Sequence, residues 1–127
     1  MTKKLVYLAC PYSHPDEAVR LTRFNAANRM SSVLMQAGVF IFSPISHTHP
    51  IALHGLPLGW DFWEPYDRAI LETCRAVLVL CCDGWEKSKG VTAEIGIASE
   101  LGLPVGFIHP ECEPEAVRRA KVGGLCG

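Results

Sequence analysis

The sequence predicts a single α/β domain over residues 1–127, in which a parallel sheet of four to five strands carries helices on both faces. Three observations predict this fold class. The chain has 127 residues, which is enough for one compact domain and not for two. Four short apolar segments have the pattern of buried strands, at residues 5–10, 39–43, 76–82 and 105–108. Helical or irregular segments separate these strands, and such alternation is typical of parallel sheets.

The first strand leads into a turn and a long helix. Residues 5–10 are rich in strand formers, and Pro11 ends them. Ser13 and, three residues later, Asp16 form a pattern similar to a capping box. We therefore expect a helix that starts at this turn and runs to about Ala37, where a glycine follows and favours its end.

The segment after the second strand is the least regular part of the pattern. Residues 44–60 contain three prolines and three of the five histidines, so we expect an irregular loop. Loops of this length in compact domains are often functional. A helix over residues 61–74 follows, with Asp61 as its N-cap or, because Pro65 lies inside the segment, with a start near Glu64.

The third strand leads into the loop and helix that hold the strongest candidate residue. The loop contains two glycines, and the predicted helix covers residues 91–101. Glu94 lies in its first turn and on the same face as apolar residues. This position suits a functional carboxylate, and the alternative is a glutamate that stabilises the helix dipole. A short final helix is expected over residues 114–121.

Composition narrows the classes of function. The formal net charge is −1, which disfavours binding to a nucleic acid polymer. No apolar run approaches the roughly 20 residues that cross a bilayer, and the N-terminus lacks the pattern of a signal peptide. The six cysteines form no C-x-x-C motif, which favours a reduced cytoplasmic protein over a disulfide scaffold.

The segments that follow the strands are candidates for a ligand site, because open parallel sheets bind ligands beyond the carboxyl ends of their strands. Ser88 and Gly90 precede a helix and can hold a phosphate through backbone N–H groups, although both are also ordinary capping residues. His47 and His49 form an H-x-H pair with too few further ligands for a metal site, so a pocket-lining or solvated histidine is expected. P-loop and G-x-G-x-x-G motifs are absent as well, and we expect neither a metal nor a cofactor.

Two features allow more than one interpretation. Asp67 lies in the second predicted helix, either as a functional carboxylate or as an exposed residue paired with a nearby arginine. An aromatic cluster in the same segment predicts a subunit contact, since such clusters usually form a core or an interface. Its members are Trp60, Phe62, Trp63 and Tyr66.

Three of these segments together resemble the nucleoside 2-deoxyribosyltransferase superfamily, and most closely its small bacterial and phage members of uncharacterised function. They are Leu8–Ala9–Cys10–Pro11–Tyr12, Asp67, and Ser88-x-Gly90-x-x-x-Glu94. The resemblance extends from about residue 5 to residue 108, and Cys10 replaces the glycine that is usual in the first loop. It implies a Rossmann-like, flavodoxin-like sheet and a homodimer or homotetramer.

The resemblance also implies roles for individual residues. Glu94 would be the nucleophile on the anomeric carbon, and water or a second base would resolve the covalent glycosyl-enzyme. Asp67 would assist the leaving group, and Tyr12 would orient the nucleophile. We expect helix N–H groups to lower the pKa of Glu94 and keep it ionised. Substrate contacts are expected from Ala9, Pro11, Ser88, Gly90 and His47.

Ser88 determines which substrate is expected. Nucleoside transferases of the family carry an aspartate at this position, whereas a serine is similar to deoxynucleoside 5′-monophosphate N-glycosidases, where it binds the phosphate. A hydroxyl group at a helix N-terminus accepts a phosphate that an aspartate would repel. We expect cleavage of the N-glycosidic bond of a (deoxy)nucleoside 5′-monophosphate or nucleoside, by hydrolysis or by transfer to a second base. The alternatives are a non-catalytic nucleotide-binding or sensing module on the same fold and a metal-dependent hydrolase that uses the histidine loop.

Overall fold

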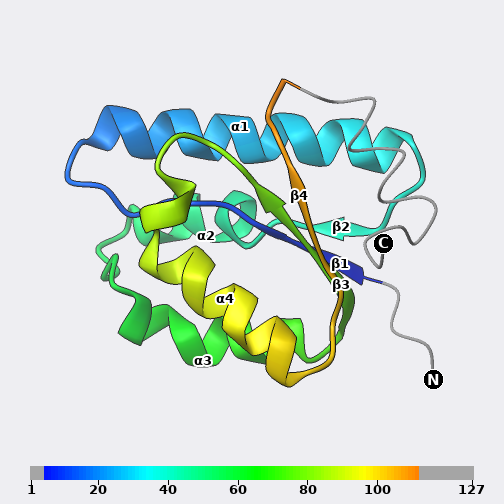
Figure 1. Cartoon of the computed structure of the whole chain (residues 1–127). Coiled ribbons are helices and arrows are strands. Elements are labelled where there is room, and N and C mark those ends of the chain that lie inside the picture. Colours follow the sequence, from blue (N-terminus) through cyan, green and yellow to red (C-terminus); the bar gives the residue numbers. More distant parts are fainter. Residues whose placement is uncertain (1–4, 112–127) are drawn as a thin grey trace.

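The computed structural model describes residues 5–111, which form a four-stranded parallel sheet with helices on both faces (Figure 1). The predicted fold class is confirmed. The strand order is β2-β1-β3-β4. The expected helix over residues 114–121 lies outside the described residues. In chain order, the elements are β1 (Leu5–Ala9), α1 (Glu17–Gln36), β2 (Ile41–Phe42), α2 (Pro44–Ala52), α3 (Trp60–Leu71), β3 (Cys74–Leu80), the 3₁₀ turn η1 (Trp85–Lys87), α4 (Lys89–Glu100) and β4 (Val105–Ile108).

Each face of the sheet has its own hydrophobic core, because successive side chains of a strand point to opposite faces. Val6 and Leu8 of β1 pack in the core under α1 and α2, which also contains Met30. Tyr7 and Ala9 point to the other face and pack in the core under α3 and α4. The hydroxyl group of Tyr7 therefore lies on the side of the sheet that α4 covers.

The strand order reverses between β1 and β3, and in open α/β sheets ligands bind at this switch point. The chain leaves β1 toward α1 on one face and leaves β3 toward α4 on the other. Arg23 of α1 connects the two departing loops. Its guanidinium group donates to the carbonyl oxygens of Tyr12 at 3.4 Å, Ser13 at 3.1 Å and Asp83 at 3.1 Å.

Residues 44–52 form the helix α2, so the prediction of an irregular loop is wrong for this part. Ser43 is the N-cap, and its Oγ accepts a hydrogen bond from the backbone N–H of Ser46 at 3.3 Å. Pro44 occupies the first turn, where its missing N–H group leaves no helical hydrogen bond unmade. The irregular part is reduced to residues 53–59.

Two other helices begin at residues that differ from those expected. The N-cap of α1 is Asp16, whose Oδ1 accepts from the N–H of Ala18 at 2.9 Å. Ser13, the expected cap, instead donates to the carbonyl oxygen of Leu58 at 2.7 Å. The helix α4 begins at Lys89, two residues earlier than predicted, and its N-cap is Ser88.

The helix α3 begins at Trp60, before both of the starts that the sequence suggested, Asp61 and Glu64. It continues through Pro65, which removes one backbone donor from the helix. None of the helices within residues 5–111 has the length and apolar character that a membrane span requires.

Candidate active site

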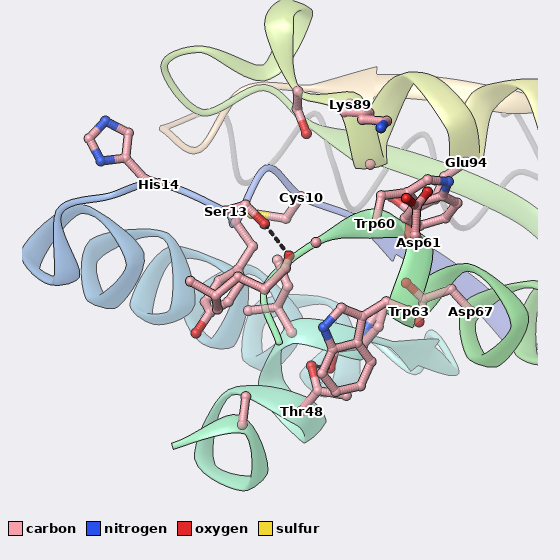
Figure 2. A pocket seen from close by; sticks show the side chains of 18 of the residues that line it. Cys10, Ser13, His14, Thr48, Trp60, Asp61, Trp63, Asp67, Lys89 and Glu94 are labelled. Carbon is pink, nitrogen blue, oxygen red and sulfur yellow. Dashed lines mark hydrogen bonds between the residues drawn. The ribbon is translucent and has the colours of Figure 1, made fainter. Parts of the chain in front are cut away.

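A cavity of about 580 Å³ lies at the carboxyl edge of the sheet, beside the switch point (Figure 2). Its wall comes from the loop after β1, from α2, from α3 and from the segment that joins η1 to α4. A cavity of this size suits a small-molecule ligand. Five of the residues expected at the site line it, namely Tyr12, Asp67, Ser88, Gly90 and Glu94.

Glu94 lies in the second turn of α4 and is 5% exposed. Its Oε2 accepts a hydrogen bond from the hydroxyl group of Tyr7, which is fully buried in β1. Burial raises the pKa of Glu94 to about 8; the hydrogen bond from Tyr7 opposes this rise, and the charge of Asp67 adds to it. The expectation that helix N–H groups would lower this pKa is therefore wrong. Those groups belong to the preceding turn of α4, where Ser88 is the N-cap.

Asp67 approaches the same cavity from α3 and is 8% exposed, so the alternative of an exposed helical residue is wrong. Within residues 5–111, its Oδ1 has no hydrogen-bond partner, although buried carboxyl oxygens almost always have one. Burial raises the pKa of Asp67 to about 6, and the nearby hydroxyl group of Tyr7 opposes the rise. The unpaired oxygen is available to a donor group on a bound molecule.

Asp67 and Glu94 titrate as a pair, because each carries its charge within electrostatic reach of the other. The pair loses one proton near pH 6, mainly from Asp67, and the other near pH 8, mainly from Glu94, so at neutral pH it holds a single proton that lies mainly on Glu94. Burial also raises the pKa of Tyr7 well above its usual value, which keeps this hydroxyl group a hydrogen-bond donor. Such a pair can both accept and donate a proton under physiological conditions.

The tyrosine that contacts Glu94 is Tyr7, whereas the resemblance assigned the orienting role to Tyr12. The hydroxyl group of Tyr12 is hydrogen-bonded to Nδ1 of His49, whose ring stacks on Phe24 with 4.2 Å between centroids. The two tyrosines lie on different sides of the sheet. Tyr7 points toward α4, whereas Tyr12 lies beyond the strand and packs against the core under α1 and α2. Tyr12 lines the cavity, but its polar end is already bonded.

The end of the cavity at α4 suits an anion. Ser88 Oγ accepts a hydrogen bond from the N–H of Val91 at 3.2 Å and so caps the helix. Lys87 and Lys89 flank Ser88, and both line the cavity together with Gly90. This end therefore combines a helix N-terminus with two ammonium groups, which is a favourable environment for a phosphate or carboxylate.

Three of the expected substrate contacts do not line the cavity. Ala9 and Pro11 are buried in the protein interior. His47 is exposed on α2, and its Nε2 lies 3.2 Å from the hydroxyl oxygen of Tyr66. Two positions along a helix correspond to more than half a turn, so His49 points into the protein while His47 points away from it. We assign none of these three to substrate binding.

The aromatic segment is divided between the cavity and the surface. Trp60 and Trp63 line the cavity, whereas Phe62 and Tyr66 are exposed. The sequence contains a signal for this division that the prediction of a subunit contact did not use. Trp60, Trp63 and Asp67 are spaced three and four residues apart, which places them on one face of α3.

The histidines do not converge on a metal site. His49 is buried against Tyr12, His47 contacts Tyr66, and His54 is exposed. In the part of the chain that the structure describes, no group of three His, Cys, Asp or Glu side chains has an arrangement that could hold a metal ion. These three histidines are therefore not a ligand set.

Comparisons with known proteins identify the family and the fold of the chain. A family described as a domain of unknown function (DUF1937) matches residues 4–109. Among solved structures, a 2-deoxyribosyltransferase from the psychrotolerant bacterium Bacillus psychrosaccharolyticus is similar, with a TM-score of 0.58 and 21% sequence identity over 84% of this chain and 72% of that chain. That enzyme is described as a biocatalyst for the synthesis of antiviral and antitumoral nucleosides. No curated protein matches the chain.

The two similarities support different statements. The solved structure confirms the expected resemblance at the level of the fold, which is that of a 2-deoxyribosyltransferase. The family match covers most of the chain, so this protein is a member of the DUF1937 family.

Proposed function

We propose that this protein cleaves the N-glycosidic bond of a (deoxy)nucleoside 5′-monophosphate or nucleoside through a covalent bond to Glu94. The observation that carries the proposal is the pair of buried carboxyl groups, Asp67 and Glu94, on the wall of one cavity. Burying two carboxyl groups beside each other is unfavourable for the fold, so their presence favours a functional role over a packing role. The shared fold supports this class of reaction by analogy.

The geometry is consistent with a two-step reaction. The reactive form is the minor one, in which the single proton of the pair has passed from Glu94 to Asp67. Ionised Glu94, held in place by Tyr7, attacks the anomeric carbon of the sugar, and the bond from that carbon to the base nitrogen breaks. The base leaves with the electron pair and takes a proton from the carboxyl group of Asp67. Water in hydrolysis, or a nitrogen of a second base in transfer, then attacks the anomeric carbon, the bond from that carbon to the Glu94 oxygen breaks, and the Asp67 carboxylate takes up the proton that the attacking group loses. Both routes share the first step and regenerate the Glu94 carboxylate.

The direct test is an assay for free base. The purified protein is incubated with nucleosides and with nucleoside 5′-monophosphates of both sugars, and released base is separated by chromatography. Base release from a member of this panel supports the proposal. Tight binding without release of base from any of them would instead favour a nucleotide-binding or sensing module.

The Asp67→Asn variant is expected to change the shape of the pH profile. In the unchanged protein, kcat/KM should be bell-shaped between about pH 6 and about pH 8, because the productive form of the pair holds one proton. Without the acid, the rate should fall by about 10²–10⁴-fold. The decrease in kcat/KM above about pH 8 should vanish, and kcat/KM should instead rise to a plateau as Glu94 ionises. Steady-state kinetics across this range measure both effects.

The control for this variant is Asp61→Asn, which changes an exposed acid on the wall of the same cavity. It should keep the bell-shaped profile. An alkaline limb that persists in Asp67→Asn would contradict the assignment of Asp67 as the proton donor.

Substitutions of Ser88 are expected to separate nucleotide from nucleoside substrates. Ser88→Asp and Ser88→Asn both keep a side chain that caps α4, but only the aspartate adds a negative charge at the proposed phosphate position. Ser88→Asp should lower kcat/KM for monophosphates by about 10–100-fold through charge repulsion and should change nucleoside cleavage much less. Parallel kinetics on a nucleoside and its monophosphate give the comparison. An equal fall for both substrates would remove the basis for a phosphate site at Ser88.

A further inference from the structure

Two cysteines lie side by side where the two central strands end. Their Sγ atoms are 4.0 Å apart, and both residues are free thiols in the described part of the chain. Cys10 follows β1 directly, and Cys82 follows β3 after one intervening residue. Because β1 and β3 are hydrogen-bonded neighbours, the sheet itself holds the two sulfur atoms together at the switch point.

We propose that Cys10 and Cys82 are a redox modification site, which hydrogen peroxide closes into a disulfide at the wall of the active-site cavity. Cys10 lines that cavity, whereas Cys82 does not. The disulfide depends only on the geometry of the thiols. Its effect on catalysis rests on the proposed function.

Cys82 is the thiol that reacts first. It is half-buried and therefore within reach of a small oxidant, while Cys10 is buried. The hydrogen bond from the Cys10 thiol lowers the pKa of Cys82, and the guanidinium group of Arg23 lowers it further. The same hydrogen bond and burial raise the pKa of Cys10. The proton therefore stays on Cys10 and the thiolate forms at Cys82, which is the more reactive species.

The chemistry balances with peroxide as the only added reactant. The Cys82 thiolate attacks one oxygen of hydrogen peroxide, the O–O bond breaks, and the sulfenic acid forms with release of hydroxide, which takes up a proton. The sulfur of Cys10 then attacks the sulfur of Cys82, and the hydroxyl group leaves as water with the proton of Cys10. In total, two thiols and one hydrogen peroxide give one disulfide and two waters, and two electrons pass from sulfur to oxygen.

The neighbouring cysteines do not compete for this reaction. Cys81 packs in the core under α3 and α4, on the opposite face of the sheet from Cys10 and Cys82. Its thiol is directed to the carbonyl oxygen of Val79 at 3.7 Å. Cys74 begins β3 and so lies at the far end of that strand.

Closing the bond moves a side chain of the cavity wall, that of Cys10. A disulfide has an S–S length near 2.05 Å, so the two sulfur atoms must approach by about 2 Å. Cys10 precedes the turn that carries Tyr12, and both residues line the cavity. Oxidation therefore draws Cys10, a residue of the cavity wall, toward Cys82, and displacements near 1 Å can reduce catalysis by about 10²-fold.

The test of the bond uses the full chain, reduced and then exposed to hydrogen peroxide. Remaining thiols are alkylated, and non-reducing peptide mapping by mass spectrometry locates any cross-link. We expect a peptide pair joined through Cys10 and Cys82 that dithiothreitol separates. Cys82→Ser should lose the cross-link, and Cys81→Ala, the matched control on the opposite face, should keep it. Alkylation of both thiols after oxidation, or a cross-link from Cys10 to any other cysteine, would overturn the proposal.

The effect on the site is measured by base release. Oxidised protein should lose about tenfold or more of its activity and regain it with dithiothreitol. Cys82→Ser should keep its basal activity and resist peroxide. A cross-link that leaves activity unchanged would overturn the effect on the cavity. A cross-link in a protein that releases no base from any substrate would support the disulfide and count against the proposed glycosidic cleavage, so the two failures are distinguishable.

Discussion

Glu94→Gln is expected to abolish base release and leave the fold intact. Glutamine has the same shape as glutamate, and its amide oxygen still accepts the hydrogen bond from Tyr7. It cannot supply the carboxylate that forms the glycosyl ester, so kcat/KM should fall by about 10³-fold or more. In the unchanged protein, rapid acid quenching followed by mass spectrometry of peptides should detect a sugar on Glu94. The variant should show no such adduct.

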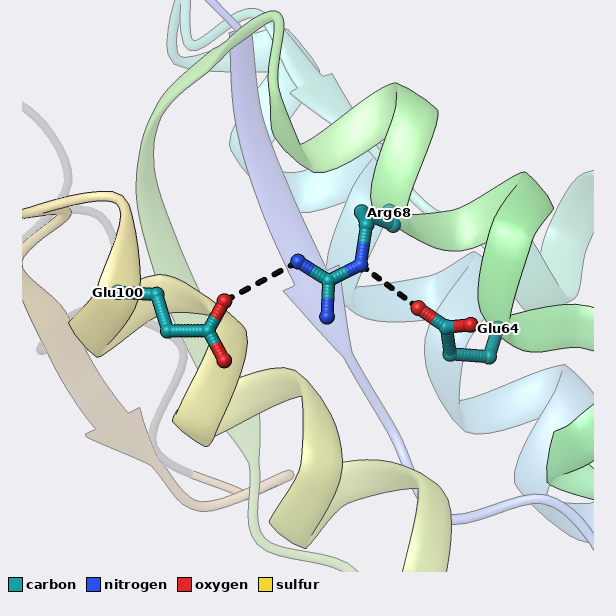
Figure 3. Close-up of polar contacts among 3 residues, drawn as sticks. All are labelled: Glu64, Arg68 and Glu100. Atoms are coloured by element: carbon teal, nitrogen blue, oxygen red, sulfur yellow. Dashed lines mark hydrogen bonds and ion pairs between the residues drawn. The ribbon is translucent and has the colours of Figure 1, made fainter.

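The matched control for this substitution is Glu100→Gln, on the same helix. Glu100 is exposed and accepts from Arg68 at 3.1 Å, and Arg68 also donates to Glu64 at 2.7 Å (Figure 3). Exposed ion pairs of this kind contribute little to stability, so Glu100→Gln should keep full activity. More than about a tenth of normal activity in Glu94→Gln would show that another group forms the covalent bond.

Glu94→Gln is also expected to make the protein more stable at alkaline pH. The pKa of Glu94 is about 8 in the folded protein, against 4.5 without the influence of the fold. The folded state therefore keeps a proton that the unfolded state has lost, and the free energy of unfolding falls as pH rises through this interval. The stabilising contribution is present below the unfolded pKa and is lost as pH rises through about 8. Glu94→Gln removes this loss and should gain on the order of 5 kcal/mol at pH 9, because each pKa unit between 4.5 and about 8 corresponds to roughly 1.4 kcal/mol.

Urea unfolding at several pH values measures this effect. Near pH 4, the variant and the unchanged protein should have similar free energies of unfolding, and the difference should grow toward pH 9. The variant should keep only the smaller decrease that Asp67 contributes below about pH 6. Glu100→Gln should follow the unchanged protein throughout. A free energy of unfolding that rises between pH 5 and pH 8 in the unchanged protein would contradict a protonated, buried Glu94.

The expected loss of base release and the expected gain in stability in Glu94→Gln have one cause. A nucleophile that is buried beside a second carboxyl group is poorly solvated when ionised, so the arrangement that suits catalysis is unfavourable for the fold. Opposite effects of one substitution on activity and stability are typical of active sites. They would distinguish a catalytic Glu94 from a residue that only packs against its neighbours.

The fold could be predicted from the sequence because its signals are local. Each strand is a short apolar run, and the helices have recognisable first and last residues. The strand order was the main feature of the fold that could be learned only from the structure. The helix α2 was missed because prolines were weighted as helix breakers, whereas Pro44 in a first turn favours a helix. The observed starts of the other helices differ from the predicted ones by a few residues, because several side chains in each turn can act as the N-cap.

The candidate site was predictable only where it depends on position along the chain. Glu94 and Ser88 follow the end of a strand, and any parallel sheet brings such segments to one edge. The roles of Tyr7 and His49 depend on which way a side chain points, and on contacts with elements distant in sequence. A hydroxyl group within the apolar run of β1 was the available signal for Tyr7. The pKa of Glu94 could not be predicted, because burial arises from the whole fold.

The hydrogen bond between Tyr7 and Glu94 joins residues that are 87 positions apart. Contacts of such high sequence separation form late in folding, because the entropy of the intervening chain must be lost before they stabilise anything. The intervening chain here includes α1, β2, α2, α3 and β3. No partly folded fragment of the chain can therefore contain the site. During refolding, the return of the proposed base release would report the docking of α4 against β1, whereas helical circular dichroism would report only local structure.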